Sequence, residues 1–212
     1  MISLDDDITD IVRACNYHIR ALRHIRPLIN RDTANIVACS IVFSRLHYCN
    51  AILYGVSEHN ITRLQRVQNS LARVVCRAPY RSSATQLRRA LHWLPVRQRI
   101  EYKVASLTFK VRLHHQPIYI SELVIDHVPT RSTRSSDKVL LVVSTAKTAT
   151  AFRAFRVAAP RTWNSLPLEV RSTASTRIFN QRLKTHLFDS VHITKWSPNG
   201  ASISVPGRML DV

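Results

Sequence analysis

Glycine is scarce in this chain of 212 residues, which contains only Gly55, Gly200 and Gly207. Glycine is the usual residue in the tight turns that join β-strands, because it adopts positive backbone φ angles without a steric penalty. Phosphate loops and dinucleotide-binding turns also need several glycines close together. The sequence therefore disfavours a many-stranded β fold and both kinds of nucleotide site, and it favours helices.

Apolar residues recur at helical spacing in three successive segments of residues 1–78. The first segment, residues 8–26, ends at Pro27, and its arginines lie away from the apolar face. The second runs from about Thr33 toward Gly55, and the third runs from about Asn60 to Val75. The candidate N-caps are Asp32 or Thr33 for the second helix and Ser57 or Asn60 for the third. Residues 1–78 are therefore predicted to form a bundle of three antiparallel helices.

Residues 79–189 have a more mixed pattern. The pattern predicts helices over about 84–92, 96–114, 118–126 and 175–188. The run 139–143 is typical of a β-strand, and residues 151–159 fit either a second strand or a short helix. The predicted fold class is mainly α, with a short β hairpin or strand pair in this second region. Residues 190–212 have no periodicity and are expected to form a loose tail.

The chain is strongly basic, with 31 Lys and Arg residues against 13 Asp and Glu residues and a formal net charge of +18 at pH 7. Between Glu58 and Glu101 there are nine arginines and no acidic residue. Unpaired guanidinium groups repel one another unless a polyanion neutralises them. The alternative is a solvated face balanced by acids elsewhere, but four of the 13 acids crowd the N-terminus. The charge pattern therefore favours contact with an RNA or DNA backbone.

The candidate phosphate ligands share a basic side chain outside the apolar stripes, and they are Arg63, Arg66, Arg73, Arg77, Arg88, Arg89, Arg97, Arg99, Arg131 and Arg134. Contacts to phosphate give affinity without sequence readout. A second set is expected to anchor loops against helices, and it consists of Trp93, Leu94, Pro95, Trp163, Leu166 and Pro167. The first set predicts a function and the second a structural role.

No pattern of residues indicates catalysis. The consecutive carboxylates of Asp5, Asp6 and Asp7 precede a predicted helix, where they suit its N-terminus better than a metal site. The four cysteines form no CxxC pair and are expected to be buried free thiols in a reducing compartment. We expect no cofactor, no metal and no small-molecule substrate.

Nothing in the sequence has the features of a secretory signal peptide or a membrane span. Residues 1–7 lack a basic start followed by an apolar core. No apolar run approaches the roughly 18–20 residues that a transmembrane helix needs. An intracellular protein of the cytoplasm or nucleus, without membrane contact, is the expectation.

Several blocks of the sequence resemble the C-terminal part of reverse transcriptases from non-LTR (LINE-type) retrotransposons, particularly the chicken-repeat and jockey-like groups. The blocks occur in the order of that family, span about residues 8–189, and are CNYHIRALRHIRPLI (15–29), SRLHYCNAILYGV (44–56), ITRLQRVQNSLARVV (61–75), LHWLPVRQRIEYKV (91–104), RSTRSSDKVLLVV (131–143), FRVAAPRTWNSLPLEVRS (155–172) and FNQRLKTHLF (179–188). Two departures are His47, where the family usually has Asp, and Ala151, near a customary Gly.

The resemblance implies a position downstream of the polymerase palm. The palm's Tyr/Phe-Ala-Asp-Asp motif, whose aspartates bind catalytic magnesium, does not occur in this sequence, and neither does the endonuclease domain. By analogy, residues 8–77 would be the helical thumb that grips the template–primer duplex. Residues 82–189 would be the region that helps to hold element RNA and target DNA. The resemblance thus implies a nucleic-acid-binding fragment without polymerase activity of its own, which could associate with the rest of a reverse transcriptase.

Two other interpretations remain open from the sequence alone. The chain could be a helical module that binds protein through apolar helix faces, which would leave a large exposed apolar patch. It could also be a non-functional relic of a retroelement.

Overall fold

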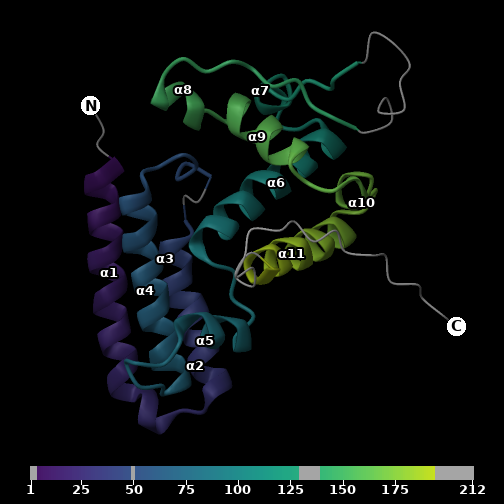
Figure 1. Ribbon diagram of the computed structural model, residues 1–212. Coiled ribbons are helices and arrows are strands. Elements are labelled where there is room, and N and C mark those ends of the chain that lie inside the picture. The colour runs from purple at the N-terminus through teal and green to yellow at the C-terminus, as the bar shows by residue number, and fades with distance from the viewer. Residues whose placement is uncertain (1–3, 49–50, 129–138, 194–212) are drawn as a thin grey trace, which may run out of the picture.

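The structure is a computed structural model that describes residues 4–48, 51–128 and 139–193 (Figure 1). It is mainly helical, as predicted. Its α-helices are α1 (Leu4–Ile25), α2 (Arg31–Val37), α3 (Ser44–Leu46), α4 (Glu58–Cys76), α5 (Ala84–Ala90), α6 (Val96–His114), α7 (Ile118–Ser121), α8 (Ala149–Arg153), α9 (Phe155–Asn164), α10 (Leu168–Arg171) and α11 (Thr176–Ile193). A 3₁₀ turn, η1 (Arg26–Leu28), follows α1, and a π-helical segment, η2 (Ala38–Phe43), joins α2 to α3.

The first half of the chain forms a three-helix bundle in which consecutive helices alternate in direction (Figure 1). The α2–η2–α3 run, which follows α1 and precedes α4 in the sequence, runs in the opposite direction, so α1 and α4 point the same way and pack on each other. Side chains near the two ends of this pair confirm the parallel arrangement. Arg63 bonds Thr9 at 2.9 Å near the start of both helices, and Arg26 bonds Val75 near their ends.

Capping residues differ in part from the predicted ones. Asn30, which directly precedes α2, accepts a hydrogen bond from the Thr33 amide at 2.8 Å and is the N-cap. The backbone oxygen of Asn30 also accepts from Ala34 at 3.1 Å, so the helix begins before Asp32. Ser57 is the N-cap of α4, because its hydroxyl accepts from the Asn60 amide at 3.4 Å. The α2–η2–α3 run ends at Leu46, short of the predicted approach to Gly55.

The core of the bundle extends past residue 78, where the first predicted region ends. Leu91, Trp93 and Val96 are buried in the same apolar cluster as Leu64 and Leu71 of α4. The tight packing of these residues joins the α5–α6 connection to the bundle.

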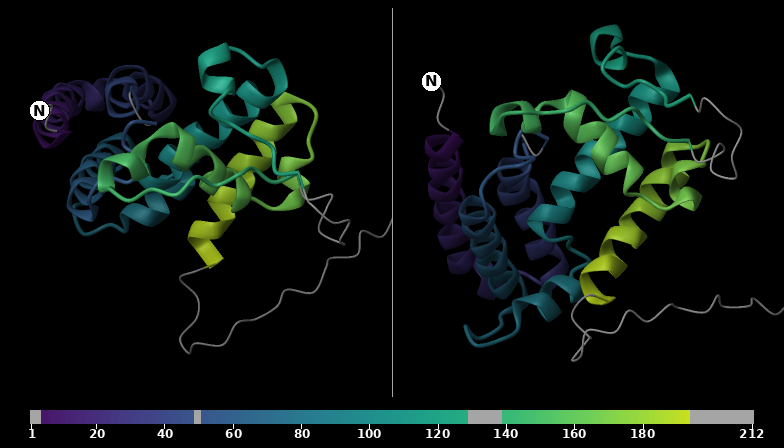
Figure 2. Two further views of the ribbon diagram at one scale, coloured as in Figure 1. Left: turned by 90° about the horizontal axis from the view of Figure 1, so that it is seen from above. Right: turned by 45° about the horizontal axis from the view of Figure 1, so that its top comes forward.

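Helix α6 links the bundle to the rest of the chain, and Figure 2 shows it crossing between the two groups of helices. Its first turns place Val96 and Ile100 in the core of the bundle. Farther along, Phe109 enters a second cluster, where its ring stacks on Phe179 with centroids 4.1 Å apart. Trp163 completes this cluster, with its ring centroid 5.8 Å from that of Phe179.

The predicted β hairpin is wrong for the residues that the structure describes. Residues 139–143 form a single antiparallel bridge, Asp126 with Leu141, and no strand. The bridge uses the Leu140 carbonyl and the Val142 amide, and the side chain of Asn164 occupies the opposite edge of the segment. Its amide oxygen accepts from the Leu141 N–H and its amide nitrogen donates to the Leu141 carbonyl, both at 2.9 Å. The Asn164 side chain therefore occupies the Leu141 amide and carbonyl, which a strand on that edge would have used. Apart from Ala154, residues 151–159 belong to helices α8 and α9.

Three further boundaries are corrected by the structure. Helix α7 ends at Ser121 rather than near residue 126, and α5 ends at Ala90 rather than near residue 92. Helix α11 continues to Ile193, so the predicted tail cannot begin at residue 190. Residues 194–212 of that tail, and Arg131 and Arg134 of the Ser-rich loop, lie outside the described residues.

The predicted anchor residues take different positions. Trp93, Leu94, Trp163 and Leu166 are buried. Their polar atoms have partners: Trp93 donates to Asn35 at 3.2 Å, Trp163 donates to the Val139 carbonyl at 2.8 Å, and the Leu94 carbonyl accepts from Gln68 at 2.9 Å. Pro95 and Pro167 stand at the N-caps of α6 and α10, and Pro167 is exposed.

The cysteines are only partly buried, against the prediction. Cys15 is buried, Cys76 is half-buried and Cys39 is exposed, and all three are free thiols. Cys49 lies outside the described residues. None of the described helices combines the length and apolar character needed to cross a membrane.

Replacing Trp163 tests the second cluster. Trp163 is 0% exposed, so Trp163→Ala should lower the free energy of unfolding by about 3–5 kcal/mol through lost burial and the cavity left behind. Tyr119→Ala, which removes an aromatic ring that is 71% exposed, is the control and should change it by less than about 0.5 kcal/mol. Urea denaturation measures both. Equal midpoints for Trp163→Ala and the parent would contradict the assignment of this core.

Candidate nucleic-acid interface

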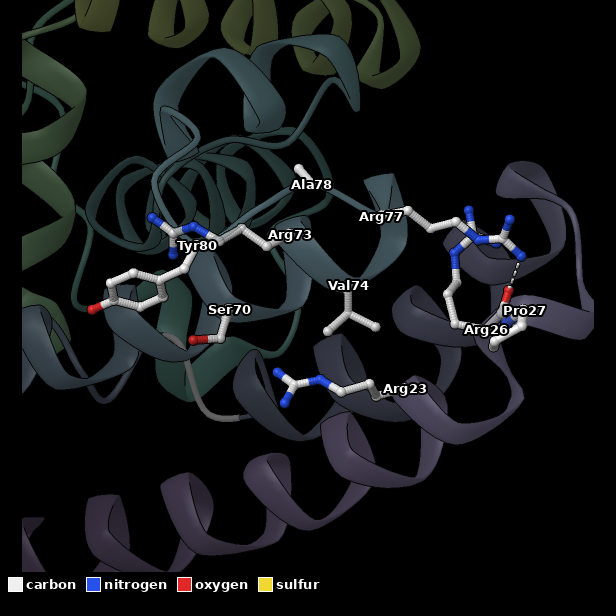
Figure 3. Close-up of a pocket in the computed structure, with 9 residues that line it drawn as sticks. All are labelled: Arg23, Arg26, Pro27, Ser70, Arg73, Val74, Arg77, Ala78 and Tyr80. Atoms are coloured by element: carbon white, nitrogen blue, oxygen red, sulfur yellow. Dashed lines mark hydrogen bonds between the residues drawn. The ribbon is translucent and has the colours of Figure 1, made fainter.

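A basic hollow lies where the C-terminal ends of α1 and α4 meet, and we call it the α1–α4 groove. Its volume is about 450 Å³. Its lining residues are Arg23, Arg26, Pro27, Ser70, Arg73, Val74, Arg77, Ala78 and Tyr80 (Figure 3). Four of these described residues are arginines and none is acidic. The groove therefore combines a concave shape with uncompensated positive charge.

Arg26 builds the floor of the groove. It is only 7% exposed, and its Nε and Nη2 atoms donate to the Val75 carbonyl at 3.0 and 2.7 Å. Its Nη1 atom donates to the Ile29 carbonyl at 2.7 Å. The carbonyls in the last turn of α4 lack partners within the helix and carry the negative end of its dipole, which a guanidinium satisfies well. The role of Arg26 is structural.

Arg77 stands just past the end of α4 with a left-handed backbone, at φ 50°. The Arg77 amide donates to Val74 and the Ala78 amide donates to Arg73, which is the hydrogen-bond pattern of a Schellman cap. Glycine is the usual residue at this position, and any other costs about 1 kcal/mol of conformational energy. The arginine side chain donates to the Arg26 carbonyl at 2.7 Å and lines the groove.

Arg73 and Arg23 face the same hollow from two helices. The Arg73 guanidinium lies over the Tyr80 ring, 5.3 Å from its centroid, and donates to the Ser82 carbonyl at 3.4 Å. Arg23 is exposed and points from α1 toward Ser70 (Figure 3). Arg66 is exposed four residues before Ser70, so it extends the same face of α4 by one turn.

The remaining predicted arginines on α4 and α5 have other surroundings. Arg63 joins α4 to α1 through its bond to Thr9. Arg88 is buried and donates to Asn69 and Thr85, so it fastens α5 to α4 and is not available to phosphate, contrary to prediction. Burial, with a smaller contribution from Arg73, lowers the pKa of the Arg88 guanidinium. Arg89 is exposed on α5.

Arg97 and Arg99 begin the same helix, α6, but lie in different surroundings. Arg97 forms an ion pair with Glu58, so a carboxylate already neutralises it. Arg99 donates to Nδ1 of His47 at 3.2 Å and lines a separate hollow with Lys184 of α11. The ten predicted arginines therefore do not make one surface, and among the described ones Arg73 and Arg77 line the α1–α4 groove, with Arg66 beside them.

The sequence did not single out Arg23 as a ligand. Its position off the apolar face of the first helix was visible, but its neighbours depend on the parallel packing of α1 against α4. Periodicity within one helix does not reveal which helix lies beside it.

The bond from Arg99 determines the protonation of His47. Arginine only donates, so Nδ1 of His47 must be an acceptor and the proton of the neutral ring lies on Nε2. Burial, together with the positive charge of Arg99, lowers the pKa of His47 to about 3. His47 is therefore neutral in the folded protein at physiological pH.

Comparisons of the chain with protein-family models, with curated proteins and with solved structures find no match. Within the described ranges, no three His, Cys, Asp or Glu side chains gather in a way that could hold a metal ion.

Protonation of His47 should weaken the fold as the pH falls. Its pKa in the folded state, about 3, lies below its ordinary value of 6.5, so acid favours the unfolded chain. Between pH 7.5 and 5 the free energy of unfolding should fall by about 2 kcal/mol more in the parent than in His47→Asn. The asparagine oxygen preserves an acceptor for Arg99, and the other histidines titrate in both proteins. Denaturation midpoints at pH 7.5 and 5 measure the difference, and parallel pH profiles would contradict it.

Proposed function

We propose that this chain binds the sugar–phosphate backbone of RNA or DNA through the α1–α4 groove. We further propose that it is the thumb and C-terminal region of a non-LTR retrotransposon reverse transcriptase, without polymerase activity of its own. The observation that carries the proposal is the groove's set of guanidinium groups, whose hydrogen bonds go to neutral carbonyl oxygens. Arg26, Arg73 and Arg77 each donate to a backbone carbonyl, and such bonds leave their positive charge in place.

The difference between a hydrogen bond and an ion pair supports this function. The bond from Arg77 to the Arg26 carbonyl orients the guanidinium but cancels no charge. Where the described arginines do meet carboxylates, in the pairs Arg13–Asp10, Arg97–Glu58 and Arg112–Asp126, the pairs lie away from the groove lining. Phosphates of a nucleic acid would supply the missing negative charge and release condensed counterions.

Tyr80 adds a surface for an unpaired base. Its side chain is 87% exposed beside the Arg73 guanidinium. Exposed aromatic rings next to cations are the usual platform for bases of single-stranded nucleic acid. The groove can therefore hold a phosphate and a stacked base of one strand at neighbouring points.

The resemblance of the sequence to retrotransposon reverse transcriptases supports the same function independently of the groove's contacts. It equates residues 8–77 with the thumb, the domain that grips template and primer in that family. The α1–α4 groove lies between the first and third helices of that segment. Since the arginines contact phosphate in this proposal, binding should show little dependence on base sequence.

The salt dependence of binding tests the groove. Four cations, Arg23, Arg66, Arg73 and Arg77, predict that the logarithm of affinity falls with the logarithm of salt concentration at a slope of about −3 to −4. Arg23→Ala combined with Arg66→Ala should make the slope shallower by about 1.5–2. Fluorescence anisotropy with a labelled oligonucleotide measures both slopes.

Lys110→Ala combined with Arg177→Ala is the control, because it removes the same charge from exposed positions on α6 and α11. The control should keep the parent's slope. A nearly flat slope for the parent, or an equal change in the two double variants, would contradict binding in the groove.

A further inference from the structure

A second hollow, separate from the α1–α4 groove, lies between η2, the α5–α6 connection and α11, and we call it the η2–α11 hollow. Its volume is about 510 Å³, which is within the range of small-ligand sites. Phe43, His47, Trp93, Arg99 and Lys184 are among the residues that line it. The walls come from segments far apart in the sequence, so the hollow exists only in the folded chain.

The central feature of the hollow is a cation without a counter-charge. The Arg99 guanidinium is half-buried, donates to His47 and lies over the Phe43 ring, 5.9 Å from its centroid. His47 is neutral and the ring of Phe43 carries no charge, so neither neutralises the guanidinium. Withdrawal of a charge from water is costly unless an opposite charge accompanies it. An anion in the hollow would offset that cost.

Lys184 places a second positive charge on the same hollow. Lys184 is exposed on α11, and it forms no ion pair with a carboxylate among the described residues. The described lining contains no acidic residue. An ammonium and a guanidinium from two different elements thus line one hollow.

Neutral donors complete the lining. The side-chain oxygen of Asn35 already accepts from Nε1 of Trp93 at 3.2 Å and from the Cys39 thiol at 3.7 Å. Its amide nitrogen therefore remains as the donor available to a ligand. The π-helical geometry of η2, which carries Cys39 and Phe43, is rare in proteins and frequently occurs at functional sites.

We propose that the η2–α11 hollow binds a phosphate group, with Arg99 and Lys184 as its cationic ligands and the Asn35 amide as a neutral donor. The planar guanidinium matches the oxygens of a phosphate, and the ammonium adds a point charge. This site does not depend on the α1–α4 groove. Its ligand is either free phosphate or the phosphate of a nucleotide.

Calorimetric titration of the full chain with inorganic phosphate and with AMP, at constant ionic strength in chloride, tests the proposal. Both probes should bind saturably. Lys184 is exposed, and Lys184→Ala should raise the dissociation constant for phosphate at least tenfold. Lys110→Ala is the matched control on α6 and should leave it within twofold. Arg99→Lys keeps the charge but loses the planar fork, and it should also weaken binding.

The result with AMP identifies the source of the phosphate. Tighter binding of AMP than of phosphate supports a nucleotide ligand, and equal binding supports free phosphate. Arg23→Ala combined with Arg66→Ala should leave phosphate binding unchanged, so failure of the groove and failure of the hollow are distinguishable. The proposal is overturned if neither probe saturates, or if Lys184→Ala and Lys110→Ala have equal dissociation constants.

Discussion

Guanidinium groups that donate to backbone carbonyls hold this fold together at its helix ends. Arg26 ties the end of α1 to the Val75 carbonyl in the last turn of α4, and Arg77 donates back to the Arg26 carbonyl. In the second half of the chain, Arg171 donates to the Leu166 carbonyl at 2.9 Å. Such bonds satisfy both the carbonyls that helices leave free and the donors of arginine. The capping position that glycine usually takes is filled by Arg77 after α4 and by His115 after α6, both with a left-handed backbone.

This use of arginine leaves the charge of the protein largely uncancelled. A carbonyl oxygen carries only a partial charge, so an arginine fixed by it still presents most of a positive charge to its surroundings. In the α1–α4 groove such arginines meet a concave surface, and in the η2–α11 hollow Arg99 is fixed in a similar way by the neutral ring of His47. The α1–α4 groove lies at one end of the three-helix bundle, and the η2–α11 hollow lies where α11 approaches that bundle. In both places the arginine is fixed by a neutral acceptor, so its positive charge stays available to an anion.

Periodicity predicts the long helices well, because the apolar stripes of α4 and α11 are fixed by burial of one face. It fails at residues 139–143, where the Asn164 side chain takes the backbone bonds of Leu141 in place of a strand. It also treats all arginines alike, although Arg88 is buried and Arg97 is neutralised by Glu58. Such differences arise from contacts between segments far apart in the sequence, which no local pattern contains.

The central claim is that the cations of the α1–α4 groove meet nucleic-acid phosphate directly. Proton–nitrogen correlation spectra of the arginine Nε–H groups, recorded while a single-stranded oligonucleotide is added, test it most directly. The Nε–H signals of Arg23, Arg73 and Arg77 should move together and saturate with the bound fraction. The signal of buried Arg88 should stay in place. Movement confined to arginines outside the groove, with those of Arg23, Arg73 and Arg77 unchanged, would contradict the account.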